Sequence, residues 1–232
     1  MKRPGGRLAS RPLHFFWMVD CSGSMEGDKI GTLNHTIQTC IPEMRKAARN
    51  NPNVDLYVRT LRFATGAQWM TKDPVHIDDF VWNDLEAYGF TELGEAYELL
   101  REQLKIPPMP RRALPPVIVL VSDGQPTDTT VNQNLGYLKK TKWFQKAVKI
   151  AIAIGRDVDE KILAEFTGNP EYVLYAGNAS DLVKLIRWAS TAASMVSAPS
   201  IPTEEGENAD VSVILDLSRF PEFDDVSVED VW

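Results

Sequence analysis

Five side chains with oxygen donors lie in three separate segments of the sequence. Two of these segments follow an apolar run, and the third follows a glycine. Asp20, Ser22 and Ser24 form a D-x-S-x-S pattern, Thr91 comes two residues after a glycine, and Asp123 follows a β-branched run. Carboxylate and hydroxyl oxygens are hard ligands, and they favour Mg²⁺, with Mn²⁺ or Ca²⁺ as alternatives, over zinc or copper. All five residues are therefore candidate metal ligands.

The charge of this donor set indicates how the metal would be used. Only Asp20 and Asp123 are charged, so a divalent cation would keep much of its positive charge, with water in the remaining coordination positions. Such an incomplete shell can accept an Asp or Glu from a partner protein. Three further acids near the motifs could support the metal ligands from a second shell or be charges at the rim, and we expect solvated charges: Asp28, Glu92 and Asp128.

Three other interpretations remain open. Asp20 could be the nucleophile of a Mg²⁺-dependent phosphohydrolase. Against this, Ser22 stands where aspartate-nucleophile phosphatases have a second acid, and no His or Lys is linked to the motif as a general base. The domain could instead be a scaffold with an incidental metal, or segment 20–24 could simply cap the next helix. We expect a binding module with no catalytic residues, and not an enzyme.

The surrounding pattern predicts the elements that would bring these residues together. Short apolar runs alternate with segments of helical period, which is typical of an α/β fold with a mostly parallel sheet and helices on both faces. We expect strands at residues 13–19, 55–63, 67–70, 117–121, 150–154 and 172–175. Strand 67–70 is expected to be a short antiparallel edge strand, paired with 55–63 through a turn. Ligands bind beyond the carboxyl ends of strands in such sheets, where all three motif segments can meet.

The helical segments are punctuated by proline and glycine. We expect helices over residues 30–48, 93–104, 135–144, 162–166 and 182–193. Pro42 is expected to kink the first helix or divide it in two. Pro107 ends the second helix and Gly168 the fourth. Thr91 is expected to open the second helix, where its hydroxyl and the positive helix end would face the metal.

Length and composition indicate one main domain. The chain has 232 residues, of which 44% are hydrophobic and 25% charged. We expect a basic extension at residues 1–12, the domain at 13–197 and an acidic tail at 198–232. Residues 203–232 hold ten acids and one arginine, a net charge of −9, against +2 for residues 1–202. We expect this tail to be partly disordered or an added strand, and hypothesise that it gives a carboxylate to the metal of its own or a neighbouring copy, with self-association as one result.

Several classes of protein are not expected. The chain lacks the dense basic stripe of a nucleic-acid groove. It has no run near the roughly 20 apolar residues that span a membrane, and run 13–19 is better interpreted as a strand than as a secretory signal. Cys21 and Cys40 form no disulfide or zinc motif, so a cytoplasmic location is expected. Cys21 is interpreted as a small side chain behind the metal loop, with a redox sensor as the alternative.

The order and context of the five candidate ligands resemble a known family. The D-x-S-x-S, Thr91 and Asp-Gly elements match the metal-ion-dependent adhesion site (MIDAS) of von Willebrand A domains, and the resemblance covers residues 13–195. It implies a Rossmann-like fold in which the serines and Thr91 are available as direct metal ligands and the aspartates often act through water. It also implies that a partner's Asp or Glu completes the shell.

Within that family, the chain is similar to the bacterial intracellular group typified by the tellurium-resistance protein TerY. The likeness rests on segments 19–25, 122–128 and 151–155. It implies a role in a stress-response or tellurium-resistance system, with an associated phosphatase or kinase as partner. Phe90 departs from the pattern, because many members have a small residue before the threonine, and its ring is expected to narrow the pocket without removing a ligand. The acidic tail is a second departure.

Overall fold

The described part of the chain forms a seven-stranded sheet. The computed structural model describes residues 10–123, 126–155, 158–178, 180–181 and 183–184. The strands are β1 (Arg11–Asp20), β2 (Val54–Ala64), β3 (Gly66–Trp69), β4 (Val75–His76), β5 (Val117–Ser122), β6 (Val148–Ile154) and β7 (Val173–Ala176). Their order is β3-β2-β1-β5-β6-β7, and β4 also pairs with β2. Strands β3 and β4 are antiparallel to β2, and all other pairs are parallel.

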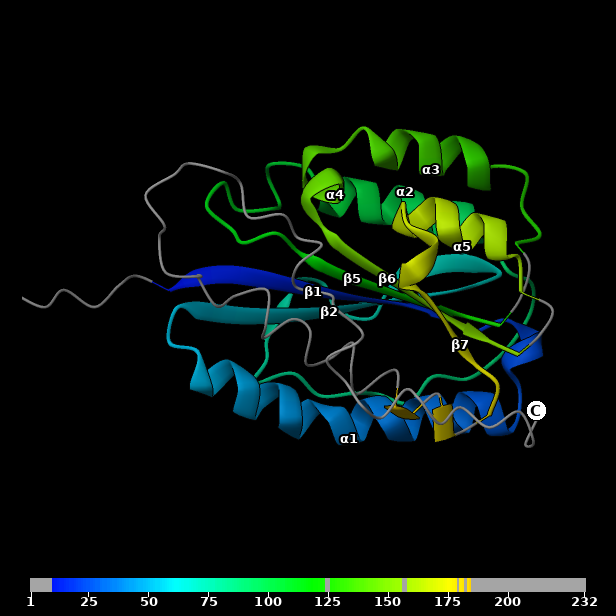
Figure 1. Cartoon of the computed structure of the whole chain (residues 1–232), viewed down its shortest axis with the longest axis horizontal. Helices are drawn as coiled ribbons and strands as arrows, with labels where there is room; N and C mark the ends of the chain where they lie inside the picture. The colour runs from blue at the N-terminus through cyan, green and yellow to red at the C-terminus, as the bar shows by residue number, and fades with distance from the viewer. Residues whose placement is uncertain (1–9, 124–125, 156–157, 179, 182, 185–232) are drawn as a thin grey trace, which may run out of the picture.

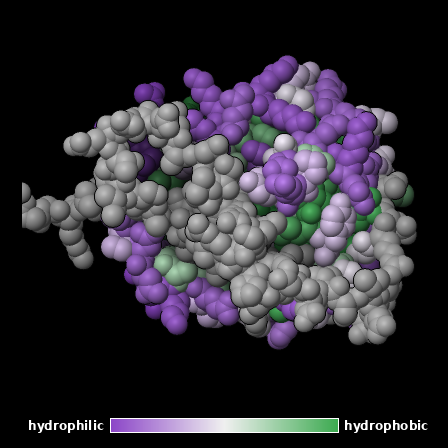
Figure 2. All heavy atoms as spheres, in the orientation of Figure 1, coloured by the Kyte–Doolittle hydropathy of each residue, from purple (hydrophilic) through white to green (hydrophobic). Residues whose placement is uncertain are grey.

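Helices cover both faces of this sheet. They are α1 (Asp28–Asn50), α2 (Leu93–Gln103), α3 (Val131–Lys139), α4 (Lys142–Lys146) and α5 (Glu160–Thr167), with short 3-10 turns η1 (Gly23–Met25) and η2 (Pro170–Tyr172). Helix α1 lies along one face, and α2 to α5 lie over the other (Figure 1). The outer surface of the layer formed by α2 to α5 is mostly hydrophilic, as expected of helices that bury only one side (Figure 2).

The central strand β1 supplies both cores. Successive side chains of a strand alternate between the two faces of the sheet. Phe15 and Trp17 therefore pack in the core on the side of α1, and Phe16 and Met18 pack in the core on the side of α2. All four are fully buried. This explains why residues 15–19 of β1 are a continuous apolar run and not an alternation.

Most of the predicted elements are confirmed, with three differences. The α/β fold with its mostly parallel sheet is present, as is the antiparallel pair of β2 and β3. Helix α1 continues through Pro42 and is not divided. The irregular helix predicted over 135–144 is two helices, α3 and α4. The two-residue strand β4 was not predicted, since so short a strand leaves no periodic signal. Residues 1–9 of the predicted extension 1–12, most of helix 182–193 and the tail lie outside the described residues.

A long segment without helix or strand, residues 77–92, leads from β4 to α2 and is fastened to α1. Arg45 donates hydrogen bonds to the carbonyls of Ile77, at 2.9 Å, and Phe80, at 2.7 Å. Asn34 donates to the carbonyl of Leu85 at 2.8 Å and accepts from its N–H at 2.9 Å. These contacts fix the path by which the chain reaches the start of α2.

Among the described helices, none is long and apolar enough to cross a membrane.

Candidate metal site

The candidate ligands lie where the strand order reverses. Asp20 is the last residue of β1, Asp123 directly follows β5, and these two strands are parallel neighbours. From β1 the sheet continues to β2 on one side and to β5 on the other. Ligands of open α/β sheets bind beyond the carboxyl ends of the strands at such a point. The topology therefore brings the first and third motifs to the same crevice.

The loop after β1 folds back on the carboxylate that precedes it. Oδ1 of Asp20 accepts a hydrogen bond from the N–H of Ser22 at 2.8 Å, and the hydroxyl oxygens of Ser22 and Ser24 lie 3.0 Å apart. The 3-10 turn η1 produces this closeness, because it tightens the chain over residues 23–25. The D-x-S-x-S spacing thus gathers a carboxylate and two hydroxyl groups within one turn.

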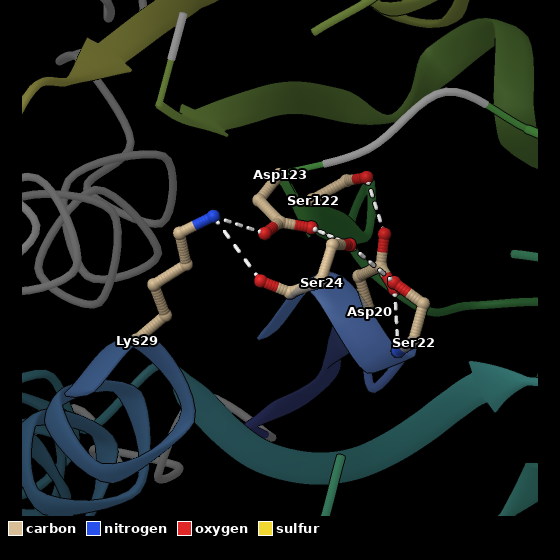
Figure 3. Close-up of polar contacts among 6 residues, drawn as sticks. All are labelled: Asp20, Ser22, Ser24, Lys29, Ser122 and Asp123. Atoms are coloured by element: carbon tan, nitrogen blue, oxygen red, sulfur yellow. Dashed lines mark hydrogen bonds and ion pairs between the residues drawn. The ribbon is translucent and has the colours of Figure 1, made fainter. Parts of the chain in front are cut away.

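Two hydrogen bonds join this loop to the end of β5 (Figure 3). The Ser24 hydroxyl donates to Oδ1 of Asp123 at 2.7 Å, and the Ser122 hydroxyl donates to Oδ2 of Asp20 at 2.6 Å. Ser22 and both aspartates are buried, whereas Ser24 is exposed. Four of the five predicted ligands therefore form one hydrogen-bonded cluster that reaches solvent at Ser24. The role of Ser122 was not predicted, because it depends on a contact between distant strands.

Thr91, the fifth predicted ligand, is attached to the site by its backbone. Its N–H donates to Oγ1 of Thr127 at 3.2 Å, and its carbonyl accepts from the N–H of Thr127 at 2.9 Å. This pairing ties Thr91 to the segment that follows Asp123. Thr91 is buried, and within the described part of the chain no hydrogen bond joins its hydroxyl to the cluster of four.

Helix α2 is capped by a residue from another segment. Its N-cap position is Glu92, so Thr91 lies one residue before the cap and does not open the helix as predicted. Oδ2 of Asp128 accepts a hydrogen bond from the N–H of Gly94 at 3.0 Å, which satisfies a free donor of the first turn. The Glu92 carboxylate accepts from the N–H of Gly66 at 2.9 Å. Asp128 and Glu92 are therefore partly buried and bonded to backbone N–H groups, and are not the fully solvated charges that were expected.

A tight turn at Gly89 holds the second segment against the first. Gly89 has a φ of +67°, and a Cβ there would lie 2.2 Å from Oγ1 of Thr65, so only glycine fits. Its carbonyl accepts from the N–H of Gly23 at 3.0 Å. The aromatic residues on either side, Tyr88 and Phe90, are 41% and 66% exposed. The Phe90 ring therefore lies at the surface beside the site and does not fill it.

Burial dominates the electrostatics of Asp20. Its side chain has no exposed surface, and the loss of solvation raises its pKa above the ordinary value. Hydrogen bonds from Ser122 and Ser22 act in the opposite direction, while the charge of Asp123 raises the pKa further. A bound cation would relieve both the desolvation and the repulsion of the two carboxylates. The environment of Asp20 is thus one in which a positive ion is stabilising.

Lys29 forms an ion pair with the second carboxylate of the site, Asp123. Nζ of Lys29 lies 2.5 Å from Oδ2 of Asp123 and donates to the carbonyl of Ser24 at 3.2 Å (Figure 3). The Asp123 side chain has no exposed surface, and that of Lys29 is 23% exposed. Lys29 was not identified from the sequence because it lies outside the motif. Its neighbour Asp28 is exposed, as expected.

The Cys21 thiol lies behind the metal loop, with no exposed surface. Burial raises the pKa of Cys21 to about 12, and the charge of Asp20 contributes in the same direction. A thiol is a nucleophile only as the thiolate, so this cysteine is held in its unreactive form. The structure thus favours the packing interpretation of Cys21 over the redox sensor.

The donor set fits a hard divalent cation. The cluster offers two carboxylates and the hydroxyls of Ser22 and Ser24, with Thr91 on the adjoining segment, and all of these are oxygen donors. In the described ranges, no group of three or more His, Cys, Asp or Glu residues could hold a metal ion. A cation site here therefore depends on hydroxyl oxygens, which suits Mg²⁺, Mn²⁺ or Ca²⁺.

Comparison with known proteins gives a family match and a shared fold. Residues 16–188 match the von Willebrand factor type A domain. No curated protein matches the chain. The similar solved structures include a von Willebrand factor type A protein from Catenulispora acidiphila, with a TM-score of 0.60 and 14% identity over 80% of this chain and 43% of that one.

Two further structures share the fold. Proximal thread matrix protein 1 from the mussel byssus, whose MIDAS motif is occupied by zinc, has a TM-score of 0.58 and 19% identity over 81% of this chain and 46% of that one. The pilus adhesin SpaC from Lactobacillus rhamnosus GG has a TM-score of 0.65 and 13% identity over 81% and 31%. The chain thus spans less than half the length of each of these three structures.

Proposed function

Because the chain belongs to the von Willebrand factor type A domain family, we propose that it is a metal-dependent protein-binding module. A divalent cation binds the five residues of a MIDAS, and a partner's Asp or Glu completes its shell. The observation that carries this proposal is the hydrogen-bonded cluster of Asp20, Ser22, Ser24 and Asp123, which joins two segments of the motif at the carboxyl ends of β1 and β5.

The chemistry of the cluster supports Mg²⁺ as the resting ion. Two carboxylates and several hydroxyls are the kind of set that Mg²⁺ takes together with water. With only two negative ligands, the ion keeps an affinity for a third carboxylate. That third carboxylate is the feature that we assign to the partner.

The surface beside the cluster supports a protein as the partner. The exposed rings of Tyr88 and Phe90 flank Gly89, whose carbonyl is bonded to the metal loop at Gly23. Aromatic side chains are enriched at protein interfaces, where they often contribute most of the binding free energy. A partner that reaches the metal would meet these rings.

The surroundings of Asp20 support binding over phosphoryl transfer. Its two carboxylate oxygens accept hydrogen bonds from Ser22 and Ser122, and its side chain has no exposed surface. A carboxylate nucleophile must reach its substrate directly, whereas a buried carboxylate can act on a bound cation through a water molecule. We therefore propose that the protein is not an enzyme.

The biological setting is the most specific part of the proposal. We assign the module to a bacterial cytoplasmic stress-response or tellurium-resistance system of the TerY type, with an associated phosphatase or kinase as partner. The support is the sequence likeness in segments 19–25, 122–128 and 151–155. The acidic tail, residues 198–232, would offer a carboxylate to its own metal or to that of a neighbouring copy. Deletion of residues 203–232 should change partner affinity or oligomeric state, and no change in either would reject this role.

Affinity capture tests the proposal. Wild type and Ser22→Ala are used as baits with either Mg²⁺ or EDTA, and Ser10→Ala, at an exposed serine outside the site, is the matched control. Wild type and the control should retain the same partner in Mg²⁺ only, and Ser22→Ala should lose it. Equal retention in EDTA would support a scaffold with an incidental metal. Metal-dependent hydrolysis of an aryl phosphate that is lost in Asp20→Asn would support the phosphohydrolase.

A further inference from the structure

Lys29 occupies a position that its own helix does not favour. It is the second residue of α1, where the positive end of the helix dipole disfavours a cation. Its ammonium group nevertheless extends to the carboxyl ends of the strands. It contacts Asp123 after β5 and the carbonyl of Ser24, and Nζ lies 4.0 Å from the position of a Cβ built on Gly155, which follows β6. The contacts with Asp123 and with the carbonyl of Ser24 account for this placement.

The two oxygens of the Asp123 carboxylate face different groups. Oδ1 accepts from the hydroxyl of Ser24 and so faces the hydroxyl cluster, whereas Oδ2 contacts the ammonium group of Lys29 (Figure 3). The lysine therefore uses the oxygen that points away from the other ligands. Lys29 and a cation bound among the hydroxyl groups would therefore contact different oxygens of Asp123, Oδ2 and Oδ1, and would not compete for the same atom.

This contact changes the charge of the site. Asp20 and Asp123 together carry −2, and Lys29 brings the total to −1. A divalent cation bound there leaves a net charge of +1, where the same ligands without the lysine would leave zero. The Asp123 side chain is fully buried, so solvent screens this pair less than it would a surface ion pair.

From this arrangement we propose that Lys29 is a built-in counter-cation, which weakens the hold of the site on its divalent ion and strengthens the attraction of the bound ion for a carboxylate. The inference rests on the proposed function, since it concerns the same site. Its physical basis is Coulombic: the ammonium group repels the incoming cation and attracts the incoming anion. The lysine thus tunes the site for partner binding at the expense of metal affinity.

The test measures both effects on the full chain at one pH. Mn²⁺ affinity is read from the electron paramagnetic resonance signal of the free ion. Carboxylate binding is read by titrating acetate into the Mn²⁺-loaded protein and following water proton relaxation, which falls as coordinated water is displaced. Lys29→Gln should bind Mn²⁺ about fivefold more tightly and need about fivefold more acetate for half-saturation. Lys29→Arg, which keeps the charge, should remain near wild type.

The opposite signs separate an electrostatic role from damage to the fold, because a disrupted site would weaken both affinities. Lys46→Gln is the matched control: it removes one charge from an exposed lysine of α1, about 25 Å further along the helix, and should change neither value. If wild type binds Mn²⁺ but Lys29→Gln leaves both affinities unchanged, or lowers both, the role of Lys29 is rejected and the proposed function stands. If wild type binds no Mn²⁺, both are rejected.

Discussion

The hydroxyl of Ser24 donates a hydrogen bond to the carboxylate of Asp123 at 2.7 Å, across 99 residues of sequence. Ser24 belongs to the turn after β1 and Asp123 to the segment after β5, so this bond joins the carboxyl ends of two neighbouring central strands. The segments that would share a cation are thus already held together by the protein's own hydrogen bonds. Such preorganisation reduces the free energy that metal binding must spend on ordering its ligands.

The attachment of α2 to the segment after β5 predicts opposite effects for two glycine substitutions. In Gly94→Ala, the new Cβ would lie 2.2 Å from Oδ2 of Asp128 and 2.8 Å from the backbone nitrogen of Val131, so the two segments must move apart. We expect a loss of about 1–3 kcal/mol in the free energy of unfolding. Gly136→Ala, in α3 with no atom within 4 Å of the new Cβ, should instead gain about 0.5–1 kcal/mol. Urea denaturation measures both, and equal effects would contradict this packing.

His14 predicts a pH dependence of stability. Its ring is buried between Phe16 and Tyr57, and neither nitrogen has a hydrogen-bond partner among the described residues. Burial lowers the pKa of His14 from 6.5 to about 4, against a smaller opposing effect of Asp55. Between these values the unfolded chain binds a proton that the folded chain does not, so stability falls as the pH drops from 6.5 towards 4.

The variant His14→Phe isolates this effect, because it keeps a stacked ring and removes the titrating group. Compared with wild type, its free energy of unfolding should improve by about 2–3 kcal/mol more at about pH 4.5 than at about pH 7.5. Urea denaturation at both pH values gives the difference. A constant difference between the two proteins would show that His14 titrates alike in both states.

Both cysteines should resist modification in the folded protein. Cys21 and Cys40 have no exposed surface, and burial raises the pKa of Cys21 to about 12. We expect a thiol reagent such as Ellman's reagent, at about pH 8, to label the native protein only as fast as the chain unfolds. Complete labelling in urea is the control for reagent quality. Rapid native labelling of Cys21 would revive the redox-sensor alternative.

The exposed ring of Phe90 should contribute to partner binding but not to metal binding. Phe90→Ala is expected to weaken the Mg²⁺-dependent partner complex by about tenfold or more, as truncation of an interface aromatic commonly does, and to leave Mg²⁺ affinity unchanged. Tyr137→Ala, at an exposed aromatic on α3, is the matched control. Surface plasmon resonance with the captured partner measures the affinities. An equal loss of partner affinity in Phe90→Ala and Tyr137→Ala would show that Phe90 has no specific role in the interface.

The sequence predicted the parts of this molecule that depend on local pattern. The fully buried run of β5 and the hairpin of β2 and β3 follow from residue type and spacing, and the D-x-S-x-S segment places the hydroxyl oxygens of Ser22 and Ser24 3.0 Å apart within one turn. Gly168 ends α5 with a φ of +79°, as its position indicated. Each of these features is decided within a few residues.

The features that were missed depend on contacts between distant segments. Lys29 and Ser122 carry no signal in sequence because their roles appear only when β1, β5 and α1 are packed together. Asp128 was expected in solvent, yet it caps a helix that begins 35 residues earlier in the chain. Of the two effects expected of Pro42, a kink or a division of α1, the division does not occur, because the helix continues through it. Packing against the sheet along the whole helix outweighs the local cost of one missing hydrogen bond.

The most direct test of the central claim is calorimetric titration of the full chain with Mg²⁺ and, separately, Mn²⁺. We expect wild type and Ser10→Ala to bind one ion per chain, and Ser22→Ala and Asp20→Asn to bind it about tenfold or more weakly while remaining folded. Equal affinity in all four proteins would place any bound ion elsewhere. No binding by wild type up to about 10 mM of either ion would contradict a metal-dependent module.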